Sequence, residues 1–147
     1  MKRSVSTLTL LSTLALLPIA GCIPSNVVAP EARAVQVDQA KLEWSRATQA
    51  DLPGFYVSTE ISGDSAGALL KAYYLFAETG SYSGAALVVG EAGPRFVVIA
   101  EDGRWALSDL GLDLQDGSGP VEVYAAPGHL RLVTPDSEIV FERVEID

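Results

Sequence analysis

The amino-acid sequence predicts an all-β domain, a small antiparallel β-barrel or sandwich of about eight strands. From Leu52 onward, turn signals made of Gly, Pro, Asp and Ser recur about every 8–12 residues, the spacing typical of such folds. The segments between them are short and rich in Val, Ile, Leu, Tyr and Phe. No long helical pattern alternates with these segments, which argues against a parallel α/β fold.

The turn signals divide this part of the chain into its expected strands. Turns are expected at residues 64–67, 79–80, 90–94, 101–103, 109–111, 116–120, 127–128 and 135–136. The expected strands are residues 55–61, 96–100, 105–107, 112–114, 121–125, 130–133 and 139–146.

Residues 68–78 fit two structures. Ser65 could cap a helix there, and Gly80 could end it. Against the helix, Tyr74 and Phe76 favour a strand, and the Thr-Gly pair that follows suits a hairpin turn between two apolar runs. We favour the hairpin.

Residues 38–50 are also ambiguous. Asp38 could cap a short helix that carries Leu42 and Trp44, yet Leu42, Trp44 and Arg46 also alternate as in a strand. We favour a short helix or turn that packs Trp44 against the domain.

The N-terminus has the layout of a secretory signal. Lys2 and Arg3 form a short positive region, and residues 5–17 form an apolar run that is shorter than the roughly 20 residues of a spanning helix. The run ends in Ile-Ala-Gly-Cys at residues 19–22, which resembles the lipobox of bacterial lipoproteins. The resemblance implies cleavage between Gly21 and Cys22, and a diacylglyceryl group on the Cys22 thiol.

Three parts of the chain follow from this interpretation. Residues 1–21 are the expected signal peptide, residues 22–37 a flexible tether, and residues 38–147 the β-rich domain. Ile23, in place of aspartate after the cysteine, favours the outer membrane under the enterobacterial sorting rule. The lone cysteine excludes an internal disulfide.

The charge of the chain limits its partners. The formal net charge is −9, and loss of Lys2 and Arg3 with the signal takes it to −11. The remaining basic residues are scattered singly, so no basic stripe can neutralise phosphates, and nucleic acid is not an expected partner. An acidic domain is also repelled by anionic headgroups, so acyl chains on Cys22 must hold it to the bilayer.

Two residues near the ends of the domain point to a family. Gly54-Phe55-Tyr56 opens it, and Arg143 lies near its end. This arrangement resembles the small lipocalin-like domains of bacterial lipoproteins, and the resemblance spans residues 52–146. Lipocalins begin with Gly-x-Trp and place a late arginine over that tryptophan, whereas here Tyr56 takes its position. The resemblance implies that the first and last strands pair and that Tyr56 and Arg143 close the barrel.

One pattern is compatible with hydrolysis. Residues 63–67 match the Gly-x-Ser-x-Gly motif of esterases around Ser65. An aspartate (Asp109, Asp113 or Asp116) and then His129 follow in the right order. The motif needs a strand and a helix on a parallel sheet, which this chain does not predict, so we favour a turn.

The same polar residues are weak metal candidates. His129 is the single histidine, and we expect a solvated residue at a hairpin tip or at the start of a strand. The spacing of Asp109, Asp113 and Asp116 departs from a calcium loop, so a solvated strand face is favoured. We expect no metal and no nucleotide, phosphate or redox cofactor.

The predicted function is non-enzymatic binding or scaffolding in the cell envelope. The aromatic residues can fill the core or line a cavity for a small apolar ligand, which is the first candidate. They are Trp44, Tyr73, Tyr74, Phe76, Tyr82, Phe96, Trp105 and Phe141. The alternative is a protein-interaction module of the envelope, such as a protease inhibitor or an assembly accessory. A serine hydrolase is a remote third.

Overall fold

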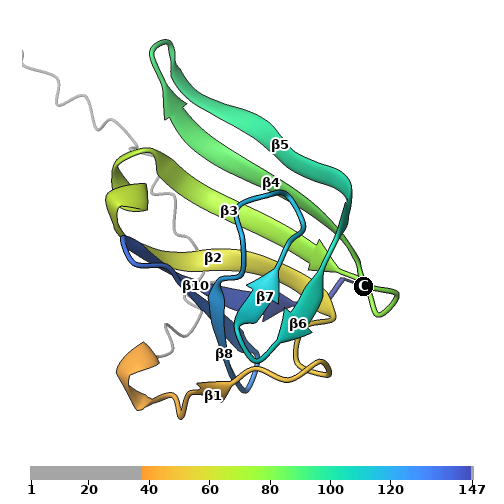
Figure 1. The fold of residues 1–147 in the computed structure, drawn as a ribbon. Coiled ribbons are helices and arrows are strands. Elements are labelled where there is room, and N and C mark those ends of the chain that lie inside the picture. Colours follow the sequence, from red (N-terminus) through yellow and green to blue (C-terminus); the bar gives the residue numbers. More distant parts are fainter. Residues whose placement is uncertain (1–37, 147) are drawn as a thin grey trace, which may run out of the picture. The chain divides into compact units, whose positions relative to one another are not determined.

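The computed structural model describes residues 38–146, and antiparallel strands make up most of them (Figure 1). Two 3₁₀ turns, η2 (Gln39–Lys41) and η3 (Asp64–Gly67), precede β1 and follow β2. The strands are β1 (Ser45–Arg46), β2 (Gly54–Gly63), β3 (Leu69–Phe76), β4 (Ser81–Gly90), β5 (Gly93–Arg104), β6 (Ala106–Ser108), β7 (Gly111–Asp113), β8 (Glu122–Ala126), β9 (His129–Val133) and β10 (Ser137–Val144). The predicted signal peptide (1–21) and tether (22–37), with Cys22, lie outside the described residues.

Eight of these strands form one antiparallel sheet in the order β1-β8-β9-β10-β2-β3-β4-β5. The prediction of an all-β fold with about eight strands is therefore confirmed. The expected closure into a barrel is wrong, because among residues 38–146 β1 pairs only with β8 and β5 only with β4. The two residues of β1 offer too few backbone groups to close a barrel against the long strand β5. The hairpin of β6 and β7 forms a second, two-stranded sheet.

The inner face of the large sheet carries an aromatic core. Tyr56, Phe76, Tyr82, Trp105 and Phe141 are all almost fully buried. Phe76 is their centre: its ring centroid lies 6.2 Å from that of Tyr56 and 6.1 Å from that of Trp105, both in edge-to-face geometry. Each such pair contributes about 0.5–1.5 kcal/mol beyond the area it buries. The described aromatic rings of this face therefore pack on one another.

The chain between residues 68 and 90 forms the favoured hairpin, and the helical alternative is wrong. β3 and β4 pair along their length, from Phe76 opposite Tyr82 to Leu69 opposite Val88. Gly80 makes the turn with a φ of 81°, which is costly for any residue with a side chain. Aromatic residues on both strands then fill the core, which a helix in this position would not allow.

β5 contains a segment that the sequence analysis assigned to a turn, residues 101–103. The strand runs through this segment because it bulges, with register shifts against Gly84 of β4. Gly103 then lies against the ring of Tyr82, where a Cβ would overlap it. Glycine is thus required here for close packing and not for a turn.

The segment before β2 contains the short helical turn that we favour, followed by the short strand of the alternative. Only η2 is helical, and the Asp38 carboxylate caps it by accepting a hydrogen bond from the Ala40 N–H at 3.2 Å. Arg46 then lies in β1, as the alternating pattern of that segment indicates. Trp44 packs against the sheet by stacking on Arg131, whose guanidinium carbon lies 4.8 Å from the ring centroid.

Candidate functional site

Tyr56 and Arg143 meet at the centre of the sheet. They lie directly opposite each other on β2 and β10, which are neighbouring strands. The Arg143 side chain donates two hydrogen bonds to the phenol oxygen, from Nε at 3.1 Å and from Nη2 at 2.6 Å. Its guanidinium carbon lies 5.3 Å from the ring centroid. The structure therefore brings the two residues together, but inside an open sheet and not at the seam of a barrel.

A third group, the backbone carbonyl of Asp51, completes this contact. It accepts hydrogen bonds from the Tyr56 hydroxyl at 2.6 Å and from Arg143 Nη2 at 2.8 Å. We call these three groups the clasp. Because Asp51 precedes β2 in a loop, the clasp ties that loop to the middle of the sheet. Sequence analysis missed Asp51, since a backbone acceptor leaves no pattern in the side chains.

The loop is held from within as well. The Asp51 carboxylate accepts hydrogen bonds from the hydroxyl of Thr48 at 2.6 Å and from its N–H at 2.7 Å. These bonds lower the pKa of Asp51. Burial raises the pKa of Tyr56, while the hydrogen bond from Arg143 acts in the opposite direction. The neutral phenol therefore donates to the Asp51 carbonyl at neutral pH.

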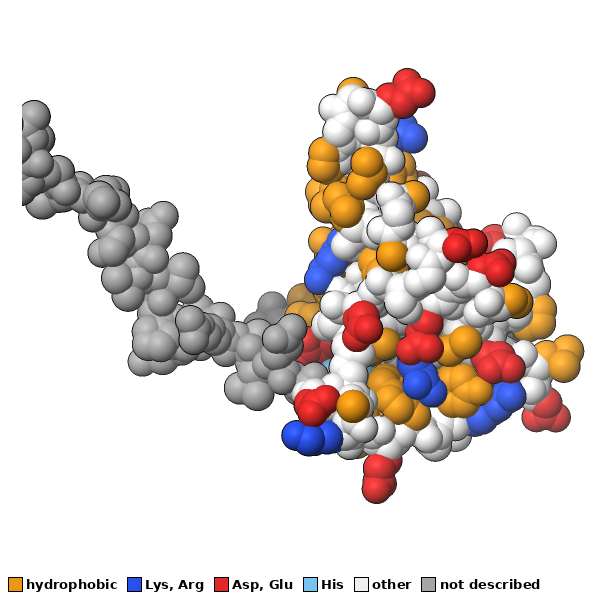
Figure 2. Space-filling model, turned by 90° about the vertical axis from the view of Figure 1, so that its left-hand side faces the viewer, with side chains coloured by type: hydrophobic (Ala, Val, Ile, Leu, Met, Phe, Trp, Pro, Cys, Tyr) orange, Lys and Arg blue, Asp and Glu red, His pale blue; other side chains and the backbone are white. Residues whose placement is uncertain are grey.

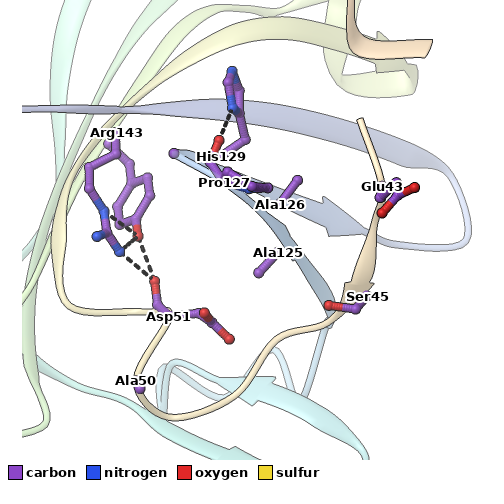
Figure 3. Close-up of a pocket in the computed structure, with 11 residues that line it drawn as sticks. Glu43, Ser45, Ala50, Asp51, Ala125, Ala126, Pro127, His129 and Arg143 are labelled. Atoms are coloured by element: carbon purple, nitrogen blue, oxygen red, sulfur yellow. Dashed lines mark hydrogen bonds between the residues drawn. The ribbon is translucent and has the colours of Figure 1, made fainter. Parts of the chain in front are cut away.

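The clasp forms one wall of a surface pocket of about 310 Å³ (Figure 3). The pocket is lined by Glu43, Ser45, Ala50, Asp51, Tyr56, Ala125, Ala126, Pro127, Gly128, His129 and Arg143. His129 is the first residue of β9, as one alternative predicted, but it is buried and not solvated. Its Nδ1 donates to the Pro127 carbonyl at 2.9 Å, because a carbonyl can only accept. In Figure 3 the imidazole lies apart from Arg143 and Asp51.

The polar groups of the clasp bond one another. Arg143, Tyr56 and the Asp51 carbonyl share four mutual hydrogen bonds, and His129 bonds its own turn. The clasp thereby holds the loop before β2 against the sheet.

Ser65 lies in η3, the turn between β2 and β3, as the turn interpretation of the Gly-x-Ser-x-Gly pattern predicts. Its N–H donates to the Ser137 hydroxyl at 2.9 Å. Gly63 is required there, because its φ is 76° and a Cβ would overlap the Asp136 carbonyl. Within residues 38–146 no hydrogen bond joins Ser65 to His129 or to an aspartate.

The aspartates of the candidate calcium segment serve local turns. Asp113 accepts a hydrogen bond from the Gln115 N–H at 2.7 Å, and Asp116 accepts from the hydroxyl and N–H of Ser118. The bonds from Ser118 lower the pKa of Asp116. Asp109 receives a bond from Arg46 on its backbone carbonyl. In the part of the chain that the structure describes, His, Cys, Asp and Glu side chains form no group of three suited to a metal.

The outer face of the sheet was missed by sequence analysis, although it exposes several large apolar side chains. Its exposed side chains come from three adjacent strands, and Figure 2 shows hydrophobic side chains gathered towards the projecting end of the molecule. We define the outer apolar face as Tyr73, Leu75, Leu87, Val89, Phe96 and Val98. Phe96 and Val98 on β5 are 69% and 66% exposed.

A sequence signal for this face does exist. Residues 85–89 and 96–100 are uninterrupted apolar runs, whereas a strand with one solvated face alternates between apolar and polar residues. Such runs predict apolar side chains on both faces of the sheet. Only the inner face is covered by the core here, so the outer side chains remain exposed.

A second surface pocket of about 630 Å³ lies beside the end of β9. It is lined by Leu110, Ser118, Gly119, Pro120, Val121, Glu122, Val133, Thr134 and Pro135. The lining contains aliphatic side chains and no aromatic ring. The aromatic ligand cavity expected as one alternative is therefore not what these residues form.

No protein-family model, curated protein or solved structure matches this chain. The lipocalin-like resemblance of residues 52–146 therefore stays a prediction. Among residues 38–146, no helix has the length and hydrophobicity needed to span a bilayer.

Proposed function

We propose that this chain is a membrane-anchored lipoprotein of the cell envelope whose β domain is a non-enzymatic protein-binding module. The observation that carries the proposal is the outer apolar face, which exposes Phe96 and Val98 beside Leu75 and Val89. Contiguous exposed apolar side chains mark interaction surfaces in soluble domains. The role is that of the protein-interaction module, the second of the functions predicted from the sequence.

A protein suits this face better than a small ligand does. Small apolar ligands bind in concave sites that bury most of their surface. The outer face belongs to a sheet, and Tyr73 and Phe96 on it lie with ring centroids 6.2 Å apart. The aromatic rings of the inner face already pack on one another around Phe76. An extended face rich in aromatic and aliphatic side chains matches the core of a protein–protein interface.

Photocrosslinking in intact cells tests the binding role. A photoreactive amino acid replaces Leu75 or Phe96 on the outer apolar face, and Leu110, which is 74% exposed on the β6–β7 hairpin, in the control. We expect protein adducts from the first two positions and none from the third. Adducts from Leu110 alone, or from no position, would contradict the proposal.

The anchor is a separate part of the proposal and rests on the lipobox. Acylated Cys22 would hold the domain to a bilayer, with the outer membrane expected from Ile23. Wild-type protein should enter the detergent phase in phase partitioning, and radiolabelled palmitate should label it but not the Cys22→Ser variant. Wild-type protein in the aqueous phase, without label, would overturn the anchor. Recovery in inner-membrane fractions would overturn only the outer-membrane assignment.

A small apolar ligand is the second candidate, because the larger pocket offers aliphatic walls. Val121, Val133 and Leu110 contribute to them. Native mass spectrometry of protein extracted from its own envelope separates the two candidates. A retained small molecule that is lost in Val133→Asp supports the ligand, and a retained protein that is lost in Val98→Asp supports the binding module.

A further inference from the structure

β5 is an edge strand whose open side is ready for another strand. Val89, opposite Pro94, donates its N–H to Ala68 at 2.8 Å, on the side away from β5. Hydrogen-bonded and non-hydrogen-bonded pairs alternate along an antiparallel ladder. The pair of Val89 and Pro94 is therefore non-hydrogen-bonded. Phe96 and Val98, two and four residues after Pro94, belong to pairs of the same kind, so their N–H and C=O groups point away from β4. Because β5 is the last strand of the sheet (Figure 1), these groups face its open edge.

The usable edge is short and has clear limits. Pro94 has no N–H to donate, which ends regular pairing on one side. On the other side, regular pairing ends at the bulge of β5, which begins after Val98, where the register against Gly84 shifts. Phe96 and Val98 lie between these limits, and both are highly exposed. An incoming strand is therefore held by few backbone bonds and by the side chains of these two residues.

Charge favours a second copy of the chain at this edge. The protein has a net charge of −9, so two copies repel each other over most of their surfaces. Residues 81–100 carry no formal net charge, since they contain one acidic residue, Glu91, and one basic residue, Arg95. This part of the β4–β5 hairpin can therefore approach a second copy without net charge repulsion.

We propose that β5 pairs antiparallel with β5 of a second copy, with Val97 facing Val97 across a two-fold axis. In this register Phe96 of each copy lies opposite Val98 of the other, and the two pairs exchange about four backbone hydrogen bonds. An aromatic and a β-branched residue form a favourable cross-strand pair. Arg95 of one copy then lies opposite Ile99 of the other, so no like charges face each other within the paired segment. The inference rests on the proposed binding role of the outer face and names its partner.

This association is a weak one that suits a tethered protein. The paired segment is short, and a two-fold contact of this size falls among transient interfaces. Anchoring two copies to one bilayer raises their effective concentration and compensates for the small interface. Joining the two β5 strands also merges both outer apolar faces into one continuous surface.

Disulfide trapping tests the register. The full chain carries Cys22→Ser, which removes its single native cysteine, together with Val97→Cys. Because this variant lacks the anchor, it is tested at about millimolar concentration, which replaces the effective concentration at the bilayer. Non-hydrogen-bonded partners have Cα atoms about 4.5 Å apart, within the range for a disulfide. Ile99→Cys is the matched control, because its two copies are offset by four residues, about 14 Å. We expect a crosslinked dimer with Val97→Cys at least tenfold in excess over Ile99→Cys, and equal or absent crosslinking overturns the pairing.

A second substitution separates this inference from the proposed function. Val98→Lys, in the Val97→Cys background, places a charge on the pairing edge and should lower the crosslinking rate at least tenfold. Leu75→Lys, on the same face but away from the edge, should leave the rate unchanged. If trapping fails while photocrosslinks from Leu75 to other proteins persist, the second copy is excluded and the binding module stands. An unchanged rate in Val98→Lys overturns the edge contact.

Discussion

Arg143 covers the ring of Tyr56 and bonds its hydroxyl at the same time, with 5.3 Å from guanidinium carbon to ring centroid and 2.6 Å from Nη2 to the phenol oxygen. The two residues are cross-strand partners, so the sheet itself sets their distance. Both then bond the Asp51 carbonyl, which belongs to a loop outside the sheet. The pair therefore holds the loop before β2 to the sheet.

Loss of the clasp should destabilise the fold. Arg143→Ala removes the cation–π contact, worth about 0.5–2 kcal/mol, together with the packing of the arginine stem. We expect the free energy of unfolding to fall by about 1–3 kcal/mol in chemical denaturation. Arg104→Ala, at the exposed end of β5, should change it by less than about 0.5 kcal/mol.

A double-mutant cycle isolates the contact itself. Tyr56→Phe keeps the ring but removes the hydroxyl that links Arg143 to Asp51. Tyr56 and Arg143 are in direct contact. The loss of unfolding free energy in the double mutant Tyr56→Phe/Arg143→Ala should therefore differ from the sum of the losses in the two single mutants by more than about 0.5 kcal/mol. Additive losses would show that the hydroxyl and the guanidinium stabilise the fold independently.

Sequence alone predicts the strands, because they follow from local patterns, whereas the meeting of Tyr56 and Arg143 is what the lipocalin-like resemblance implies. Turn residues and apolar segments mark the strands, and Tyr56 and Arg143 stand near the two ends of the domain. Barrel closure depends instead on whether β1 and β5 reach each other, which no local pattern encodes. The Asp51 carbonyl, a backbone group, is equally invisible in the sequence.

Arg131 shows how a distant segment changes the environment of a strand. The alternation of Leu130, Arg131 and Leu132 is that of a strand with a solvated arginine, yet this side chain is only partly exposed. Trp44 and Tyr124 cover its guanidinium from two sides, each ring centroid at 4.8 Å, and leave the side chain 26% exposed. Trp44 precedes β1, so its position depends on tertiary pairing and not on the strand pattern of β9.

Replacement of Arg131 should therefore be costly. Arg131→Ala removes two cation–π contacts, and we expect a loss of about 1–2 kcal/mol in the free energy of unfolding. The protein has two tryptophans, and Trp105 is buried. Trp44 should thus produce a red-shifted fluorescence in this variant, and an unchanged spectrum would show that Arg131 does not hold the indole.

Gly103 and Gly67 differ in the space that each leaves for a side chain. A Cβ at Gly103 would overlap the buried ring of Tyr82, whereas a Cβ at Gly67 would meet no atom within 4 Å. Gly103→Ala should destabilise the fold by about 1–3 kcal/mol, because the ring has no space to move. Gly67→Ala should be neutral or slightly stabilising. Equal midpoints in thermal denaturation would contradict the tight contact between β4 and β5.

The fold should also lose stability at high pH, because Tyr74 in the inner aromatic face then ionises. Its ring lies 5.6 Å from that of Phe76 and 5.7 Å from that of Phe141, and burial raises its pKa to about 12. The unfolded chain has the ordinary value of 10. Because the pKa of Tyr74 is higher in the folded protein, its neutral phenol stabilises the fold. This stabilisation is complete below pH 10 and is lost as the pH rises through 12.

The expected loss follows from the difference between the two values. Two pKa units correspond to about 3 kcal/mol, so the free energy of unfolding should fall by up to that amount between pH 10 and 12. Tyr74→Phe keeps the ring packing without the ionisable hydroxyl, so its stability should fall less over the same range. Tyr73→Phe, on the outer face, is the matched control and should follow the parent. Denaturant titrations at pH 8, 10 and 11.5 check this, and identical alkaline losses in all three proteins would place the sensitive group elsewhere.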